Sequence, residues 1–310
     1  MRTCVIINPW AARGRARRVW KVMAPQLQRA TGPFETRFTD APFSASGLTR
    51  VALLSGAELV VSVGGDGTLN EVVNGFFGTD GLVNANAALG VLMVGTGGDF
   101  RKTLGLPRDL ADQVARLSEG GIRALDVGRL RLIDPQGVES RRYFHNIASF
   151  GLSGATDHAV NSLKYAKLLG GRLAFQWGML KAMLRYRNRP VRIQIDDHFD
   201  EIISASTVAV CNGQYFGGGM RVAPHALPDD GLFDIVIVGD IGRLQLLRRV
   251  SSVYEGSHVF LDKVSVIRGR RLVASPVDTA DEILIDADGE VAGRLPAIFE
   301  ILPGALRVRA

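Results

Sequence analysis

Cysteine and long apolar runs are both scarce in this chain of 310 residues. The only two cysteines, Cys4 and Cys211, each lie in a short apolar segment typical of a buried strand. Such a pair predicts buried thiols of a cytosolic protein and excludes a disulfide framework. The longest apolar runs, such as 87–94 and 232–238, are far too short to cross a bilayer. Residues 1–8 have the pattern of a strand with no small-residue cleavage site after it, so no signal peptide is predicted.

Carboxylates are missing from two stretches of the chain. Residues 1–34 carry seven basic residues and no acidic one, and residues 158–195 carry eight and none. The whole chain has a net charge of +6 and a pI near 9.6. These stretches predict surfaces that face an anion: the phosphates of a ligand, an anionic membrane or nucleic acid. A basic face that simply contacts solvent is the alternative for either stretch.

The length exceeds that of a usual single core, which predicts two domains. In the first 125 residues, strand and helix patterns alternate, as expected for an α/β layer with a parallel sheet. The strands are expected at 3–8, 34–39, 58–63 and 88–94, and the helices at 14–30, 46–54, 68–77, 99–104 and 110–118.

Residues 126–310 have a different pattern of short strands and turns, which predicts a β-rich, sandwich-like domain. Two helical segments interrupt it, at 162–187 and 242–255. The strands are expected at 125–132, 142–148, 191–195, 206–210, 232–238, 263–267, 282–285 and 297–301.

Two glycine-rich loops follow neighbouring strands of the predicted parallel sheet. Residues 63–68 are V-G-G-D-G-T and residues 95–100 are G-T-G-G-D-F. Glycine lets backbone N–H groups approach a phosphate closely, whereas an aspartate at that place would repel it. An aspartate in each loop therefore points to a bridging divalent cation, or to a catalytic or network role. Because ligands bind at the carboxyl ends of parallel strands, the loops favour binding of a magnesium–nucleotide complex.

Several other nucleotide and catalytic motifs are missing. The first loop has neither the Gly-Lys-Ser/Thr of a Walker A motif nor the spacing of a dinucleotide-binding loop. The five histidines lack metal-ligand spacing, and His145 is expected to be a packing or surface residue.

Residues 64–75, G-G-D-G-T-L-N-E-V-V-N-G, resemble the signature of the diacylglycerol kinase-like lipid kinases, which include sphingosine and ceramide kinases and bacterial soluble lipid kinases. NAD kinases and 6-phosphofructokinases have a shorter version. Further segments resemble the family in the same order along the chain: 8–9, 92–100, 125–128, 146–154, 228–234 and 288–290. The resemblance implies a nucleotide-binding α/β domain over 1–125 and a β-rich lipid-substrate domain over 126–310.

The chain departs from the family pattern at three places. Gly98 stands where the family usually has Asn, Met93-Val94 replaces Ile/Val-Pro, and residues 11–14 are A-A-R-G rather than the usual Ser-Gly-Gly/Lys start. None of these changes removes an acid or a base. The change at Gly98 affects one polar contact of the family.

The resemblance also implies a role for individual residues, with ATP and Mg²⁺ as cofactors. Asp66, Asp99 and Asp126 would form a network of carboxylates, water and Mg²⁺, and Asp66 would also be catalytic. Arg17, or Arg15 or Lys21, would neutralise phosphate charge. The other residues of the ATP site would be Asn8, Gly64, Gly65, Gly67, Thr68, Glu71 and Thr96.

In the second domain, Asp288 would be the general base on the lipid hydroxyl, with Glu290 beside it. A hairpin turn on the surface is the alternative for Asp288. The turn at 228–234 would bind a structural cation through Asp229, Asp230 and the Leu232 carbonyl, or else be a plain type I turn.

Residues 163–192 combine an apolar helical face, which includes Trp177, with Lys and Arg on another face. This pattern predicts a helix at the surface of an anionic membrane, with packing against the β-rich domain as an equal alternative. We therefore expect a cytoplasmic protein that associates transiently with membranes, and we include a homodimer among the expected partners. No nucleic acid is expected, because no recognised motif supports it.

The resulting hypothesis is an ATP- and Mg²⁺-dependent lipid kinase that phosphorylates a hydroxyl of diacylglycerol or a related lipid. An NAD kinase-like enzyme is one alternative, although the later segments of that family are missing from the chain. A non-catalytic regulator that binds nucleotide or membrane is the other, and the retention of every expected acid argues against it.

Overall fold

The computed structural model describes residues 1–94, 98–161 and 186–309 and divides into two compact units. Unit 1 comprises Met1–Asp126 and Gly304–Ala310, and unit 2 comprises Val127–Pro303. The predicted domain boundary at 125/126 lies next to the first of these divisions. No pattern in the sequence indicates that the last residues return to unit 1. Two strands, β5 (Ile122–Ile133) and β17 (Glu290–Arg309), continue from one unit into the other.

Unit 1 is the predicted α/β layer with a parallel sheet. Its strands are β1 (Thr3–Ile7), β2 (Phe34–Phe38), β3 (Leu59–Gly64) and β4 (Ala88–Met93). They lie in the order β4-β3-β1-β2, and all the pairs are parallel. The end of β17 adds a parallel strand beside β4. The helices are α1 (Ala11–Thr31), α2 (Ser44–Leu54), α3 (Asp66–Phe76), α4 (Asp99–Thr103) and α5 (Leu110–Glu119).

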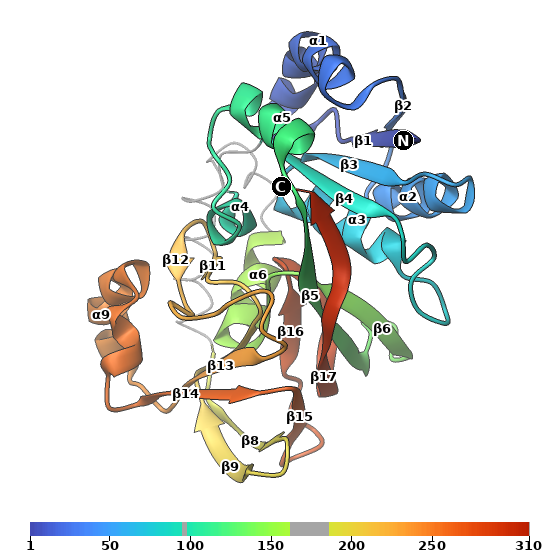
Figure 1. Ribbon diagram of the computed structural model, residues 1–310. Coiled ribbons are helices and arrows are strands. Elements are labelled where there is room, and N and C mark those ends of the chain that lie inside the picture. Colours follow the sequence, from blue (N-terminus) through green and yellow to red (C-terminus); the bar gives the residue numbers. More distant parts are fainter. Residues whose placement is uncertain (95–97, 162–185, 310) are drawn as a thin grey trace. The chain divides into compact units, whose positions relative to one another are not determined.

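Every residue of β1, β3 and β4 is buried, because helices cover both faces of the sheet. Figure 1 shows α1 and α5 on one face and α2 and α3 on the other. This burial explains why the three strands have near-continuous apolar sequences. Met23 and Leu27 of α1 pack against Val5, Leu59 and Leu92 of the sheet.

The start of α1 departs from a regular helix. Ala12, Arg13 and Gly14 have φ angles of 51°, 59° and 79°, in the left-handed region. Regular α1 therefore begins only after Gly14, which agrees with the predicted helix over 14–30. The residues that follow β1 thus form a compact turn before the helix.

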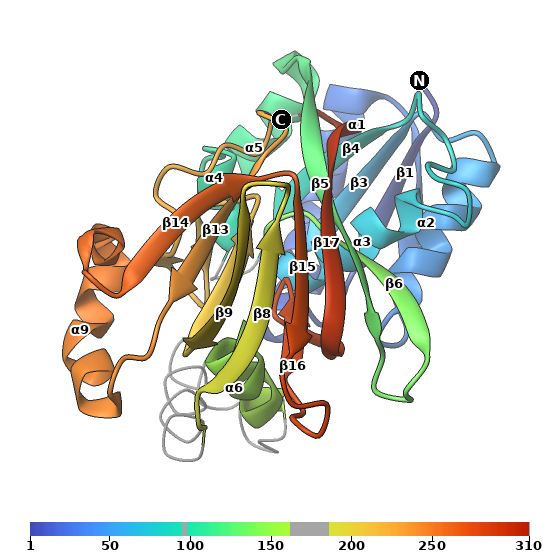
Figure 2. The ribbon, with the colours of Figure 1, turned by 90° about the horizontal axis from the view of Figure 1, so that it is seen from below.

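Unit 2 is β-rich, as predicted, and has two layers of strands. One layer has the order β14-β13-β10-β7-β16-β17, and the other has β9-β8-β15-β17-β5-β6. β17 belongs to both, because its first residues pair with β16 and residues 297–300 pair with β15. Figure 2 shows β9, β8, β15 and β17 side by side.

The remaining strands have the following bounds: β6 (Glu139–Phe144), β7 (Ile147–Gly151), β8 (Arg189–Ile195), β9 (Phe199–Ala205), β10 (Thr207–Cys211), β11 (Tyr215–Phe216), β12 (Met220–Arg221), β13 (Phe233–Val238), β14 (Val264–Gly269), β15 (Arg271–Pro276) and β16 (Leu284–Ala287).

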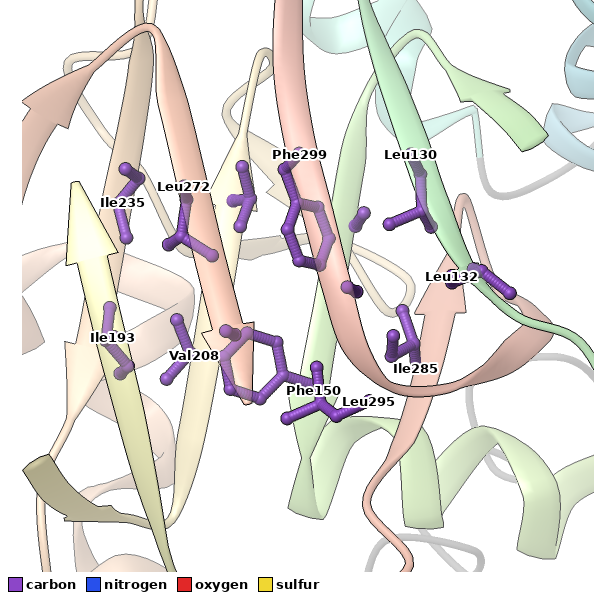
Figure 3. Packing of buried hydrophobic residues seen from close by; sticks show 14 of the residues in the cluster. Leu130, Leu132, Phe150, Ile193, Val208, Ile235, Leu272, Ile285, Leu295 and Phe299 are labelled. Carbon is purple, nitrogen blue, oxygen red and sulfur yellow. The ribbon is translucent and has the colours of Figure 1, made fainter. Parts of the chain in front are cut away.

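The core of unit 2 lies between the two layers (Figure 3). Leu272 and Phe299 come from one layer, and Phe150 and Ile235 come from the other. The aromatic rings pack against one another: the centroids of Phe150 and Phe299 are 6.1 Å apart. The alternation of apolar and polar residues along these strands places one face of each strand in this core.

Unit 2 also has the helices α6 (Leu152–Asn161) and α9 (Arg243–Glu255) and the short 3₁₀ helix η1 (Ser257–Phe260). α9 confirms the helix predicted over 242–255. The predicted basic helix over 162–187 lies outside the described residues, except for its last two. Among the residues that the structure describes, no helix is both long enough and apolar enough to cross a membrane.

Candidate active site

The carboxyl ends of β1, β3 and β4 bring the first loop and Asn8 together. The Asn8 backbone N–H donates to the Val63 carbonyl at 3.1 Å, and the Asn8 side-chain Nδ2 donates to Thr68 Oγ1 at 3.1 Å. The Val94 N–H donates to the Gly64 carbonyl at 2.8 Å, which joins the ends of β3 and β4. The second loop thus starts beside the first, although residues 95–97 with Thr96 lie outside the described residues.

The two glycines at the start of the first loop differ in the space around them. A Cβ added to Gly64 would lie 2.5 Å from Thr68 Cβ and Oγ1, so only glycine fits beside the buried threonine. A Cβ added to Gly65 would have no heavy atom of the described residues within 4 Å. Gly65 is the N-cap of α3, and no side chain caps that helix end. The start of α3 therefore presents backbone N–H groups and the positive end of the helix dipole, which favour an anion.

Asp66 ties the first loop to the second. Its carboxylate accepts hydrogen bonds from the backbone N–H groups of Gly98, at 3.0 Å, and Phe100, at 3.4 Å. Asp66 thus lies at the junction of the two loops.

Asp99 begins α4 and is 7% exposed, and its Oδ1 accepts from Lys102 Nζ at 2.9 Å. Arg101 lies in the same helix, and burial together with nearby Arg108 lowers its pKa, although Asp66 and Asp99 oppose that change. The sequence reasoning missed both cations. The signal for them was the pair of basic residues at 101–102, which follows Asp99 and Phe100.

Asp126 and Glu71 hold neighbouring segments of unit 1 in place. Asp126 is 2% exposed, and its Oδ1 accepts from the Gly304 N–H at 2.7 Å, where the end of the chain returns to unit 1.

Glu71 Oε2 accepts from the Ala45 N–H at 3.0 Å, in the first turn of α2, whose N-cap Phe43 makes no side-chain cap. The Glu71 carboxylate therefore caps the N-terminus of α2.

The basic residues that were predicted to neutralise phosphate charge lie on α1. Arg15, Arg17 and Lys21 are exposed on α1. Within the described part of the chain, no group of three or more His, Cys, Asp or Glu side chains has the arrangement of a metal site.

In unit 2, Asp288 lies in the tight turn between β16 and β17. Asp288 and Gly289 have φ angles of 52° and 86°. The Asp288 side chain is only 1% exposed, so this turn is not the plain surface hairpin considered above. Its Oδ1 accepts from the N–H groups of Asn146 at 3.1 Å and Ile147 at 3.0 Å. Its Oδ2 accepts from the His145 N–H at 3.0 Å, while Glu290, two residues later, is exposed.

His145 is buried beside Asp288, which fits the packing role considered for it in the sequence. Its ring Nδ1 lies 2.7 Å from Asp288 Oδ2, and its side chain is 2% exposed. The two residues are 143 positions apart in the sequence, so no local pattern links them.

At the predicted cation-binding turn, Asp230 pairs with an arginine. Asp230 Oδ1 accepts from the Leu232 N–H at 3.0 Å, and its Oδ2 contacts the Arg268 guanidinium. Arg268 Nε also lies 3.4 Å from Asp234 Oδ1. Burial raises the pKa of Asp234, and Arg268 partly offsets that increase. Arg268 thus supplies positive charge at this turn, while Asp229 is exposed.

Family models match both parts of the chain. A model described as the diacylglycerol kinase catalytic domain matches residues 2–130, and a model described as the YegS C-terminal NAD kinase beta sandwich-like domain matches residues 146–310. A diacylglycerol kinase from Mycobacterium tuberculosis is 31% identical over 264 residues, which are 84% of this chain and 79% of that protein. The chain belongs to the diacylglycerol kinase-like family of bacterial lipid kinases. A diacylglycerol kinase from Bacillus subtilis is 27% identical over 300 residues, 96% of this chain and 92% of that protein.

Two solved structures share the fold of this chain. A diacylglycerol kinase from Bacillus anthracis superposes with a TM-score of 0.71 at 20% identity, covering 99% of this chain and 96% of that one. A yeast NADH kinase in complex with NADH has a TM-score of 0.54 at 12% identity, covering 99% and 82%. At these identities the likeness concerns the fold alone. The predicted family and the predicted two-domain fold are thus confirmed.

Proposed function

We propose that this kinase transfers the γ-phosphate of ATP, with Mg²⁺, to a hydroxyl group of diacylglycerol or a related lipid. The observation that carries the proposal is the junction of the two loops, where Asp66 at the start of α3 binds the backbone of Gly98 and Phe100. The family and its relatives named diacylglycerol kinase support the reaction class and the type of acceptor.

The residues at the start of α3 fit a bound triphosphate. Among the residues that the structure describes, none fills the space beside Gly65, and no side chain caps the N-terminus of α3. Backbone N–H groups of residues 65–68 would hold the phosphates, with Asn8 and Thr68 beside them. Arg17 and Arg101 are the cations to which we assign the balance of phosphate charge.

Oxygen donors that suit Mg²⁺ are also present in unit 1. Because the described residues contain no cluster of three such side chains around one point, Asp66, Asp99 and Asp126 would hold the ion as a network bridged by water. When bound, the ion would supply charge neutralisation at the transferring phosphate, which is the main requirement of phosphoryl transfer. Asp99 and Asp126 are both more than nine-tenths buried, so their carboxylates are held in place by the fold.

The lipid hydroxyl must lose a proton as it is phosphorylated. We assign this role to the Asp288 carboxylate, with Glu290 beside it. Three backbone N–H groups donate to Asp288, which fixes the orientation of its carboxylate. A positioned general base contributes about 10²–10⁴-fold to a rate.

Binding to an anionic membrane belongs to the same proposal, because the acceptor is a lipid. Three arginines approach the carboxylate of Glu300 on β17: Arg129 and Arg131 of β5, at 3.0 and 3.3 Å, and Arg271 of β15, at 3.7 Å. Arg131 and Arg271 are each half-exposed, on the faces opposite the core residues of β5 and β15. A basic residue at an anionic surface contributes about 1 kcal/mol. The basic segment 163–192 would add to this attraction.

The test is a transfer assay with Mg-ATP labelled on the γ-phosphate. Mixed micelles that contain phosphatidylglycerol would present diacylglycerol, a sphingoid base or ceramide, and NAD would be offered in a separate arm. We expect label in a lipid, and loss of that label with Asp66→Asn. Label in NADP alone would replace the proposal with the NAD kinase alternative. Tight ATP binding with no labelled acceptor would favour the regulator.

A further inference from the structure

Arg101 of α4 lies across Gly98, the residue at which the chain departs from the asparagine of its family. A Cβ added to Gly98 would lie 3.1 Å from Arg101 Nε, 3.4 Å from its Cβ and 3.6 Å from its Cδ. The arginine stem therefore covers the place where any side chain at position 98 would start. The guanidinium end is also held, because Nη1 donates to the Leu106 carbonyl at 2.8 Å.

The backbone of Gly98 is fixed on both sides of this contact. Its N–H donates to Asp66 Oδ2 at 3.0 Å, and its carbonyl accepts from the Lys102 N–H at 3.3 Å. Its φ and ψ angles of 58° and 51° are left-handed, a conformation that asparagine also adopts. The backbone angles therefore allow the asparagine of the family, but an asparagine here would displace Arg101 from its place.

The guanidinium of Arg101 also lies among the charges of the loop junction. Burial and nearby Arg108 lower the pKa of Arg101. Asp66 and Asp99 raise that pKa, so both carboxylates lie near the guanidinium. They belong to the network to which we assign the ion at the transferring phosphate. Among the residues that the structure describes, only Leu106 accepts a hydrogen bond from the guanidinium, so its other N–H groups can donate to phosphate oxygens.

We propose that Gly98 and Arg101 form one unit that binds the terminal phosphate of ATP, which rests on the function proposed above. Glycine leaves the space that the arginine stem fills, and the N–H groups that do not face Leu106 donate to the phosphate. A positive charge thus replaces the amide of the family, and Arg101 favours a triphosphate over a diphosphate. Charge balance alone would not make the two residues depend on each other.

Calorimetric binding of Mg-ATP and Mg-ADP to the full chain tests the contact with phosphate. We expect Arg101→Ala to weaken Mg-ATP binding about tenfold to a hundredfold, the loss typical of a hydrogen bond to a charged group. Mg-ADP, which lacks that phosphate, should lose at most about threefold. The exposed Arg116 of α5 is a matched control for net charge, and Arg116→Ala should bind both nucleotides like the parent. Equal losses for the two nucleotides, or unchanged Mg-ATP binding by Arg101→Ala, would overturn the proposal.

A double-mutant cycle tests the coupling between the two residues. Gly98→Asn displaces Arg101, so it should weaken Mg-ATP binding as much as Arg101→Ala does. In the double variant, the asparagine has the space that the arginine stem vacates, and binding should be no weaker than in either single variant. Independent sites would add their losses instead. A double variant with additive losses, or parent-like binding by Gly98→Asn alone, would contradict the coupling.

The Tm of each variant checks that it folds. If Gly98→Asn does not fold, Gly98→Ala takes its place in the cycle, because it adds only the Cβ at 3.1 Å from Arg101 Nε. The strain of alanine at a left-handed position is common to the single and the double variant, so it cancels in the cycle.

The outcomes also separate this inference from the function on which it rests. If the parent protein shows the coupled binding of Mg-ATP but labels no lipid, the lipid kinase function fails and the inference stands. If lipid is labelled while the two residues act independently, only the inference fails. If the parent protein does not bind Mg-ATP, both are overturned.

Discussion

Alanine substitutions at the two adjacent glycines of the first loop should have different effects. In Gly64→Ala, the new Cβ would lie 2.5 Å from Thr68 Cβ and Oγ1, and both atoms belong to a buried side chain at the start of α3. Relief of that overlap requires Thr68 to shift, which also disturbs its contact with Asn8 Nδ2. Overpacking of this kind costs about 1–3 kcal/mol.

In Gly65→Ala, the new Cβ enters open space, and the backbone there is extended, with φ −107°. Alanine is a poorer N-cap than glycine by several tenths of a kcal/mol or more. Against this, alanine reduces the entropy of the unfolded chain, which stabilises by about 0.4–1 kcal/mol. The two effects are similar in size, so we expect little change in the free energy of unfolding.

The assays are thermal unfolding followed by circular dichroism and calorimetric binding of Mg-ATP. Gly64→Ala should lower the Tm, by about 2–4 °C for each kcal/mol lost. Gly65→Ala should keep the parent Tm but bind ATP at least tenfold more weakly, because the Cβ occupies the space where a phosphate would approach. Equal losses of Tm in the two variants would refute the steric argument. Normal ATP binding by Gly65→Ala would refute the placement of phosphate at this loop.

Three further predictions concern single residues. Asp66→Asn should reduce turnover at least a hundredfold and lower the Tm by a few degrees, since a charged acceptor for two N–H groups is lost; turnover within tenfold of the parent would contradict its role. Glu71→Ala should cost about 1 kcal/mol in urea unfolding, because the cap on α2 is lost, and Glu71→Gln should recover most of it. Burial lowers the pKa of His258, so protons bind preferentially to the unfolded chain, and stability should decline as the pH falls below about 6.5. His258→Asn should reduce that decline, while the exposed control His198→Gln should leave it unchanged.

Much of unit 1 could be predicted from the sequence because its patterns are local. The strands at 59–64 and 88–93 are buried on both faces, so their apolar runs are nearly continuous, and a glycine-rich loop follows each. Because parallel strands end at one edge of the sheet, the meeting of the two loops at Asp66 followed from the order of the elements.

The parts that could not be predicted depend on contacts between distant residues. The return of residues 307–309 to pair with β4 rests on a short run with two arginines, which has no distinctive pattern of its own. Glu71 belongs to the family signature, yet its carboxylate caps α2, which lies earlier in the chain. The contact of His145 with Asp288 depends on β7 lying beside β16, and no local pattern indicates that pairing.

The measurement that tests the central claim most directly is the identity of the product formed from Mg-ATP and a defined 1,2-diacylglycerol. Mass spectrometry should show a lipid heavier by one phosphate on the free hydroxyl, formed with the parent protein and reduced to background with Asp66→Asn. If no phosphorylated lipid forms from any acceptor while the protein binds Mg-ATP, or if product forms equally with Asp66→Asn, the proposed lipid kinase mechanism is wrong.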